Sequence, residues 1–248
     1  MIPVSPKNVS KLQDLSQQVS AEFKEYAYNV SHDLAAPLRA IVEFSRILQE
    51  ECSGSLDAEH REYLDVIISN GQKMQTMIQG LLTYSRLNTL AKPFTILSTS
   101  KLVSDCLYAL RDTVTSTNAK VTTDVLPDVY ADAEQLQQVF HVLIENALKF
   151  NGKNHIPRVH LSVARQQNNW CFSVADNGIG IQTRFYEKIF KLFQRLHTDE
   201  EYEGVGVGLT LAQKIVQRHG GNIWVEPNNT QGSIFYFTIP AAMPVVSL

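Results

Sequence analysis

The chain has 248 residues, with 22 Lys and Arg against 25 Asp and Glu, and 44% of its residues are hydrophobic. This is the composition of a globular protein with one large domain or two small ones, so a disordered chain, a collagen and a disulfide-stapled miniprotein are excluded. The formal net charge of -3 gives no general attraction to nucleic acid or to an anionic membrane.

The sequence shows neither a membrane-spanning segment nor an apolar leader. The longest run without a charged residue, 227–248, contains three prolines, two asparagines and a glycine, so we expect no direct membrane insertion. The cysteines are odd in number and widely spaced, which predicts reduced, buried packing thiols in a cytoplasmic protein. They are Cys52, Cys106 and Cys171.

Up to about residue 92 the hydrophobic periodicity is helical only. Apolar residues recur at steps of three and four on both sides of a turn at 52–57, which predicts a helical hairpin. Two helices cover only one side of each other's apolar stripe, so a second copy would bury the rest in a homodimeric four-helix bundle. The stripe residues are Val19, Phe23, Tyr26, Val30, Leu34, Leu38, Ile41, Leu48, Leu64, Ile67, Gly71, Met74, Ile78 and Leu81.

The expected domain boundaries follow from this pattern. Residues 22–92 would form the hairpin and residues 93–248 a second domain. Residues 1–21 extend the apolar stripe, and they fit either a coiled connector from an upstream segment or a fraying terminus.

After Pro93 short strand-like runs alternate with helical ones, which predicts an α/β sandwich. Asp132 is suited to cap a helix over 134–149 by accepting backbone amides, and Gln135 can reach back to the cap. A second helix is expected over 209–218. The expected strands are Phe94–Leu97, Lys120–Val125, Arg158–Ala164, Trp170–Ala175, Asn222–Val225 and Ile234–Ile239.

Two glycine clusters follow strand-like runs, Asp176-Asn-Gly-Ile-Gly180 and Gly204-Val-Gly-Val-Gly208. A Gly-x-Gly-x-Gly run that opens a helix presents backbone amides and the positive end of a helix dipole, which suits a phosphate. A carboxylate at a strand end, such as Asp176, can accept the amino proton of a purine. Each cluster alone is more often a pair of β-turns, so neither decides the function by itself.

The order of the motifs is more specific than any single one. Asn146 lies in the run Asn-Ala-Leu-Lys-Phe150, which is followed by the first glycine cluster, by Phe190-Lys-Leu-Phe-Gln-Arg195 and by the second cluster. These runs resemble the N, G1, F and G2 boxes of the sensor histidine kinases, and Ser31-His-Asp-Leu-Ala-Ala-Pro-Leu38 resembles their phosphoacceptor H box. The similarity extends over about residues 22–240 and is greatest to the kinases attached to phytochrome-like photoreceptors.

The resemblance implies a HisKA dimerisation and phosphoacceptor hairpin followed by a Bergerat (GHKL-type) ATP-binding domain that uses ATP and Mg²⁺. It implies that His32 attacks the γ-phosphorus, that Asp33 holds the other ring nitrogen, and that Asn146 binds the metal. A response-regulator receiver domain would accept the phosphoryl group, and a sensory module absent from this chain would act upstream. The remaining nucleotide contacts would be Lys149, Phe150, Asp176, Gly178, Gly180, Arg195, Gly204, Gly206, Gly208 and Leu209.

Further expectations concern access and movement. At about 100° per residue, His32 faces away from the hairpin seam and is accessible. Pro37 has no amide for the carbonyl of Asp33, so it loosens the helix one turn below the histidine. The resemblance also implies that residues 182–203 form a mobile lid, anchored by Phe190 and Phe193.

Two positions depart from the family pattern. Val142 stands one helical turn before Asn146, where members of the family usually carry a second asparagine, so we expect weakened use of Mg-ATP. Ala36 replaces the polar residue that positions a water in members with phosphatase activity, so little such activity is expected. Two alternatives remain open: a degenerate kinase that acts as a dimeric scaffold, and an ATPase of the wider gyrase and chaperone group.

Overall fold

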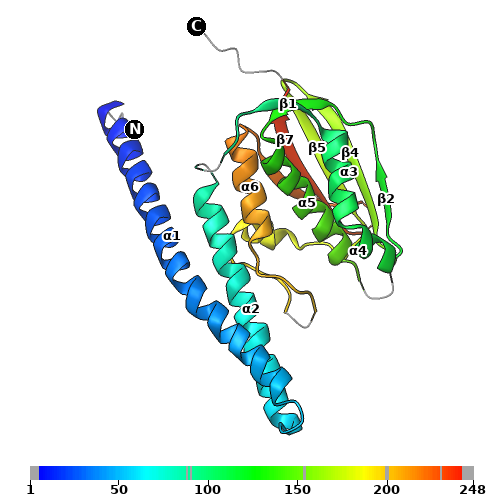
Figure 1. Ribbon diagram of the computed structural model, residues 1–248. Helices are drawn as coiled ribbons and strands as arrows, with labels where there is room; N and C mark the ends of the chain where they lie inside the picture. Colours follow the sequence, from blue (N-terminus) through cyan, green and yellow to red (C-terminus); the bar gives the residue numbers. More distant parts are fainter. Residues whose placement is uncertain are drawn as a thin grey trace. The chain divides into compact units, whose positions relative to one another are not determined.

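The structure is a computed structural model that describes residues 6–87, 89, 91–152, 155–198, 201–229 and 231–241, with side chains from residue 28 onward. The chain divides into two compact units, Met1–Leu87 and Asn88–Leu248, which are called here the hairpin unit and the α/β unit (Figure 1). Among the described residues, no helix is both long enough and apolar enough to cross a membrane.

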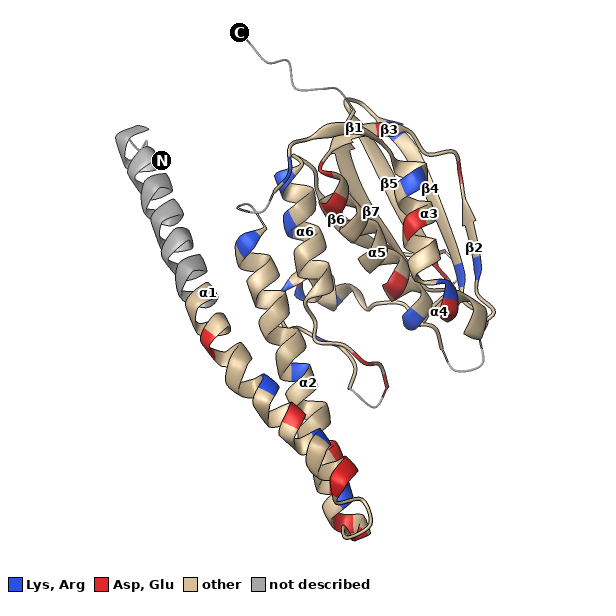
Figure 2. Ribbon diagram, in the orientation of Figure 1, with Lys and Arg blue, Asp and Glu red and all other residues tan. Residues whose placement is uncertain are grey.

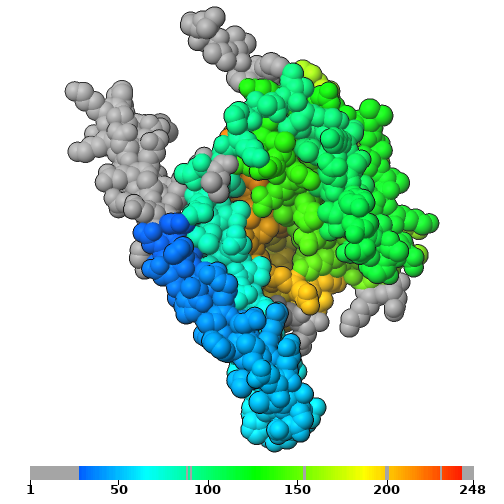
Figure 3. Space-filling model, in the orientation of Figure 1, coloured from blue at the N-terminus to red at the C-terminus, as the bar shows by residue number. Residues whose placement is uncertain are grey.

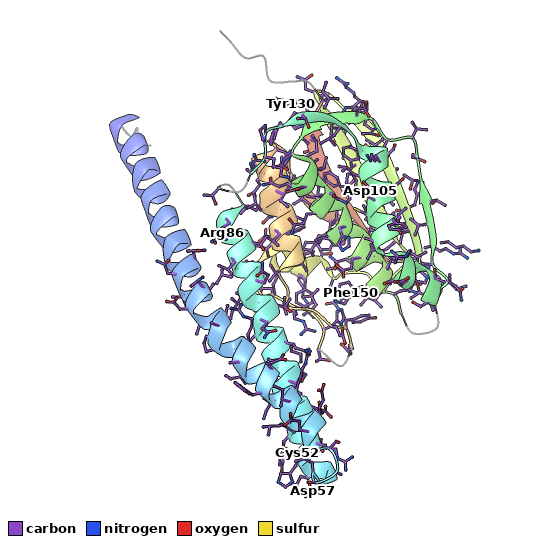
Figure 4. The ribbon with its side chains drawn as sticks, viewed as in Figure 1. Cys52, Asp57, Arg86, Asp105, Tyr130 and Phe150 are labelled. Atoms are coloured by element: carbon purple, nitrogen blue, oxygen red, sulfur yellow. The ribbon has the colours of Figure 1, made fainter. Side chains whose placement is uncertain are left out.

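The hairpin unit consists of helix α1 (Pro6–Glu51) and helix α2 (Ala58–Arg86). Asp57 caps α2, because its side chain accepts the backbone N–H of His60 at 2.9 Å. Gly71 brings the two helices close together, since a Cβ at that position would overlap the side chain of Val42. Figure 4 labels Cys52 and Asp57 at the turn, and Figure 2 shows acidic and basic residues on both helices near it.

The apolar stripe of the hairpin is only partly covered by the partner helix. Leu38 and Val42 are buried between α1 and α2, whereas other large apolar side chains on the same helices are about half exposed. In Figure 3 these helices form one continuous surface near the turn. The pattern therefore leaves an apolar face for a further packing partner. The exposed residues are Leu34, Ile41, Phe44, Leu48, Tyr63, Val66, Ile67 and Met74.

The α/β unit contains a mixed five-stranded sheet of order β2-β4-β5-β7-β6 and a separate antiparallel pair, β1 with β3. Strand β2 pairs parallel to β4, and the other neighbours are antiparallel. The strands are β1 (Thr95–Ser98), β2 (Lys120–Thr123), β3 (Asp128–Ala131), β4 (Arg158–Gln166), β5 (Asn169–Asp176), β6 (Ile223–Pro227) and β7 (Ser233–Pro240).

Helices cover one face of this sheet (Figure 1). They are α3 (Thr99–Ala109), the short α4 (Arg111–Ser116), α5 (Ala133–Lys149) and α6 (Gly208–Arg218), with α5 packed between α3 and α6. The ring centroid of Phe140 on α5 lies 5.6 Å from that of Phe172 on β5 and 5.3 Å from that of Phe237 on β7, and all three residues are at most 1% exposed. This aromatic core fixes α5 on the sheet.

One end of the α5–α6 pair is closed by a polar cluster. Asp132, only 1% exposed, caps α5 through Gln135 and forms an ion pair with Arg218 of α6 at 3.3 Å. His219 accepts the N–H of Asp132 at Nε2 (3.1 Å), and its Nδ1 donates to the carbonyl of Ile215 at 2.8 Å. Asp132 also accepts the backbone N–H of Lys92 at 2.8 Å, which attaches the segment after the hairpin to this end. We call this group the closed end.

The predicted strands and helices agree with the structure to within one or two residues, except where short elements were not foreseen. The sequence pattern did not predict β3, which has only four residues and follows Pro127, nor did it delimit α3 and α4. The prediction that the cysteines are buried is correct for Cys106 and Cys171, whereas Cys52 in the hairpin turn is only half-buried. Burial raises the pKa of Cys106 to about 11, so this thiol is unreactive.

Candidate nucleotide and phosphoacceptor sites

The carboxylate of Asp176 lies at the end of β5 and is almost fully buried, with 8% of the residue exposed. Its Oδ1 accepts hydrogen bonds from the backbone N–H of Gly178 at 2.8 Å and of Ser233 at 3.1 Å. Burial raises the pKa of this carboxyl, and the two backbone bonds oppose that shift. Asn228 Nδ2 donates to the Asp176 carbonyl at 2.8 Å. Asp176 is therefore a rigid acceptor, as recognition of an amino group requires.

The turn after Asp176 packs against the C-terminal end of α5. The N–H of Ile179 donates to the carbonyl of Phe150 at 3.0 Å, and a Cβ on Gly178 would overlap the same oxygen. Gly180 has a φ of 72°, a conformation that favours glycine. The first glycine cluster therefore packs directly on the end of α5, where Figure 4 labels Phe150.

Lys149 joins α5 to the second glycine cluster. A Cβ on Gly204 would lie 2.9 Å from Lys149 Nζ, and this amine lies 5.2 Å from the Phe150 ring centroid. Gly206 has a φ of 72°, and its carbonyl accepts the N–H of Phe193 at 2.9 Å. Asn146 is half-buried on α5, three residues before Lys149 and on nearly the same face. An ammonium beside these backbone groups suits an anionic phosphate.

Helix α6 begins at Gly208 without a side-chain hydrogen bond at its cap, so its first amides lack that partner. Leu209 follows and is half-buried. Val142 packs on this start, since a Cβ on Gly208 would lie 3.1 Å from Val142 Cγ1. Thr210 is 8% exposed, and its Oγ1 has no hydrogen-bond partner among the described residues. The start of α6 is therefore a helix N-terminus that can accept a negative group.

The segment between the glycine clusters contains two short 3₁₀ helices, η1 (Thr183–Phe185) and η2 (Lys188–Phe190). Phe190 is buried and can anchor this segment, as predicted, but the prediction is wrong for Phe193, which is 38% exposed. The backbone of Phe193 adopts a positive φ of 61° and bonds to Gly206, which leaves its ring at the surface. Arg195 Nη2 donates to the carbonyl of Tyr202 at 2.6 Å, so this guanidinium holds the segment itself.

In the hairpin unit, the His32 side chain is 73% exposed, which agrees with its predicted helical phase. His32 Nδ1 lies 3.3 Å from Oδ1 of Asp33, whose side chain is 81% exposed. When Nδ1 donates to this carboxylate, Nε2 carries the free lone pair and is the nucleophilic nitrogen. Helix α1 continues without a break through Pro37, which lies about one turn after His32.

Sequence reasoning missed the residues that support the site from a distance. Ser233 and Asn228 hold Asp176, although both lie more than fifty residues later in the chain. His197 and Tyr202 contact the Phe150 ring. The residues of these pairs lie far apart in the sequence and follow no helical or strand periodicity. The local signal for one of them is Gly232, before Ser233, which lets the chain approach the backbone of Asp176 closely.

Two family models match the chain in the order that the two units suggest. The His Kinase A (phospho-acceptor) domain matches residues 24–90, and the Histidine kinase-, DNA gyrase B-, and HSP90-like ATPase matches residues 131–243. The chain belongs to the sensor histidine kinases. His32 and Asp33 fall within the first match, and Asn146, Asp176 and Gly208 fall within the second.

Cyanobacterial phytochromes are among the similar proteins. The histidine kinase chain is 41% identical to Cyanobacterial phytochrome A of Nostoc sp. (strain PCC 7120), over 90% of this chain and 29% of the relative. It is 38% identical to Phytochrome-like protein Cph1 of Synechocystis sp. (strain PCC 6803), over 90% of this chain and 30% of the relative. The chain therefore spans less than a third of the length of these relatives.

Solved histidine kinases share the fold. Full-length ShkA in complex with AMPPNP matches with a TM-score of 0.66 and 24% identity, over 88% of this chain and 46% of that one. ThkA in complex with the response regulator protein TrrA matches with a TM-score of 0.64 and 21% identity, over 93% of this chain and 66% of that one. At these identities the likeness shows the architecture, a helical hairpin followed by an α/β ATP-binding domain.

Proposed function

We propose that this histidine kinase chain binds Mg-ATP where the two glycine clusters of the α/β unit meet the C-terminal end of α5. The chain would then transfer the γ-phosphoryl group to His32. The observation that carries the proposal is the convergence of Asp176, Lys149 and both glycine clusters on the end of α5, in a chain that also exposes a His–Asp pair. Asp176 would accept the purine amino group, and Lys149 with the start of α6 would bind phosphates.

The transfer step follows from the imidazole chemistry. Asp33 would hold Nδ1 protonated, so that the Nε2 lone pair attacks the γ-phosphorus in line. The N–P bond forms as the bond to the bridging oxygen breaks, and ADP leaves with that electron pair. The charge on the ring is stabilised by Asp33 until the Nδ1 proton is released. Because both side chains are exposed, the carboxylate chiefly orients the ring.

The protein ligand set for magnesium is small. The described residues include no cluster of three or more His, Cys, Asp or Glu side chains that could hold a metal. Asn146 fits the ion with an amide oxygen, and Mg²⁺ keeps several waters and binds nucleotide phosphates when protein ligands are few. Bound in this way, the ion would neutralise charge on the phosphates. Val142, one turn earlier and buried, cannot add a ligand.

The exposed apolar face of the hairpin supports a homodimer. Phe44 is 66% exposed, and Ile41 and Leu48 are both 53% exposed on the same helix. A second hairpin packed on this face would bury these side chains in a four-helix bundle. The partner that receives the phosphoryl group would be a response-regulator aspartate, and a sensory module would supply the input. The solved complex of ThkA with the response regulator protein TrrA is the precedent for such a partner.

Incubation with γ-labelled ATP and Mg²⁺ tests the proposal. The wild-type chain should take up a label that is lost in acid and kept in alkali, as expected for an N–P bond, and His32→Gln should remove it. His60→Gln is the matched control, because His60 is also exposed and its Nδ1 lies 2.6 Å from Asp57. A label that survives His32→Gln, or that His60→Gln also removes, would contradict the assignment.

A degenerate kinase is the second candidate, and Val142 is the observation that favours it. Its side chain contacts Gly208 at the start of α6, where a polar group would otherwise face the phosphates. Val142→Asn should raise the initial rate of autophosphorylation if the residue limits Mg-ATP use. An unlabelled wild-type chain that still binds ATP would favour the scaffold, whereas steady phosphate release without labelling would favour an ATPase.

A further inference from the structure

The ring of Phe150 is covered by two aromatic side chains from the segment between the glycine clusters. The Tyr202 ring centroid lies 5.0 Å from that of Phe150, with the planes tilted by 51°. The His197 ring lies 6.1 Å from Phe150 and 5.2 Å from Tyr202. We call His197 and Tyr202 the aromatic cap.

Hydrogen bonds fix the position of the cap. The Tyr202 hydroxyl donates to the carbonyl of Asn151 at 3.3 Å, which ties the ring to the residue after Phe150. Arg195 Nη2 donates to the Tyr202 carbonyl at 2.6 Å, and the N–H of Tyr202 donates to the carbonyl of Thr198 at 3.1 Å. The contact between Tyr202 and Phe150 is therefore held from both the backbone and the side chain.

The backbone of Phe150 and its neighbour Lys149 place this residue beside both glycine clusters. Its carbonyl accepts the N–H of Ile179, in the turn that Asp176 begins. Lys149, immediately before it, reaches Gly204 of the second cluster. A planar base whose amino group bonds to Asp176 would lie beside the half-buried Phe150 and gain from stacking on it.

The face of the Phe150 ring that Tyr202 covers has no room for both the Tyr202 ring and a purine base. A base between two rings requires a ring separation of about 7 Å, twice the carbon contact distance of about 3.5 Å. The observed separation between Phe150 and Tyr202 is 5.0 Å. A base that stacks on this face must therefore displace the Tyr202 ring.

We propose that Tyr202 is an internal competitor of the purine base, so that the aromatic cap regulates nucleotide entry. This inference rests on the proposed function and deepens it. Nucleotide binding would break the Tyr202–Phe150 contact and the hydroxyl bond to Asn151, and part of the binding free energy would be spent on opening the cap. The opposite arrangement, in which Tyr202 forms a second wall above the base, would make its removal weaken binding.

Calorimetric titration of the full chain with Mg-AMPPNP separates these arrangements. Tyr202→Ala should bind about two- to tenfold more tightly than wild type, which is the effect of losing one aromatic pair. Tyr108→Ala is the matched control, because Tyr108 is 70% exposed on α3, and it should bind as wild type does. Weaker or unchanged binding by Tyr202→Ala would overturn the proposal.

Tyr202→Phe provides a second variant that keeps the ring and removes only the bond to Asn151. It should bind more tightly than wild type by a smaller factor. If Tyr202→Ala does not fold, unchanged or weaker binding by Tyr202→Phe overturns the proposal instead.

Hydrogen exchange without nucleotide separates failure of the cap from failure of the proposed function. The amides of residues 201–206 should exchange faster in Tyr202→Ala than in wild type or Tyr108→Ala, because the cap no longer holds them. If neither the wild type nor the two variants bind the nucleotide, the proposed function fails. The exchange comparison then decides by itself whether Tyr202 holds this segment on Phe150. Equal exchange rates in all three proteins would overturn the proposal that Tyr202 holds this segment in place.

Discussion

Both ends of the α5–α6 pair contain polar side chains, but only one end supplies all the partners that these groups need. At the closed end, Asp132, Arg218 and His219 all bond to one another or to nearby backbone. At the other end, called the open end, α6 starts without a side-chain cap and Thr210 Oγ1 has no partner among the described residues.

We interpret this difference as a division between an end that stabilises the fold and an end that we propose binds a ligand. A buried polar group without a partner costs free energy, so native proteins satisfy nearly all of them. At the closed end the protein supplies the partners itself. At the open end, the glycines allow neighbouring groups to approach the backbone closely, and a bound phosphate would supply the missing partner of Thr210.

The largest expected effect is the loss of stability caused by a substitution at the closed end. Arg218→Met leaves the carboxylate of Asp132 buried without its ion-pair partner, so we expect a loss of about 3 kcal/mol in the free energy of unfolding. Urea denaturation measures it. The matched control is Arg111→Met, which removes an exposed pair with Asp112 and should cost less than about 1 kcal/mol. Similar losses in both variants would contradict the claim that the buried ion pair at the closed end stabilises the fold more than an exposed pair does.

A substitution at the open end should weaken nucleotide binding. In Gly178→Ala the new methyl group would collide with the carbonyl of Phe150 and separate the turn from α5. We expect the affinity for Mg-AMPPNP to fall by about tenfold or more, equivalent to about 1.4 kcal/mol. Gly152→Ala is the control, since its Cβ would meet only Ile179 at 3.9 Å. Equal affinities in the two variants, measured by calorimetry, would count against the assigned base site.

Two buried threonines sharpen the comparison. Thr99 is fully buried, and its Oγ1 donates to the carbonyl of Pro127 at 2.5 Å, so Thr99→Val should lower the free energy of unfolding by about 1 kcal/mol. Thr210→Val removes a hydroxyl without a partner among the described residues and should change it by less than about 0.5 kcal/mol. Urea denaturation of both variants checks this order, and a larger loss for Thr210→Val would show a hidden partner.

The smallest expected effect is a pH dependence at the closed end. Burial lowers the pKa of His219, and Arg218, Asp132 and the stacked Phe94 ring surround it. The unfolded chain therefore binds a proton more readily, so the free energy of unfolding should fall as the pH drops below the ordinary value of 6.5. His219→Gln should show a shallower fall between about pH 7.5 and about pH 5.5. An unchanged slope in urea denaturation would remove His219 as the cause.

The same contrast explains how much could be predicted from the sequence. The motifs of the open end are local in the sequence, since the glycines and Asp176 follow strand-like runs, and their order along the chain predicted which segments to expect at a nucleotide site. The closed end was predicted only in part, because Asp132 is a recognisable cap whereas its partner Arg218 is distant in the chain. Tyr202 and Ser233 were missed for the same reason. Phe193 was assigned wrongly because a residue type does not reveal a positive φ.

Hydrogen exchange of the full chain with and without Mg-AMPPNP tests the central claim most directly. Nucleotide should slow exchange at residues 176–180 and 204–210, leave exchange at residues 92–94 and 216–221 unchanged, and have no such effect in Asp176→Asn. Protection confined to the closed end, or the same protection in Asp176→Asn, would contradict the assignment of the nucleotide to the open end of α5 and α6.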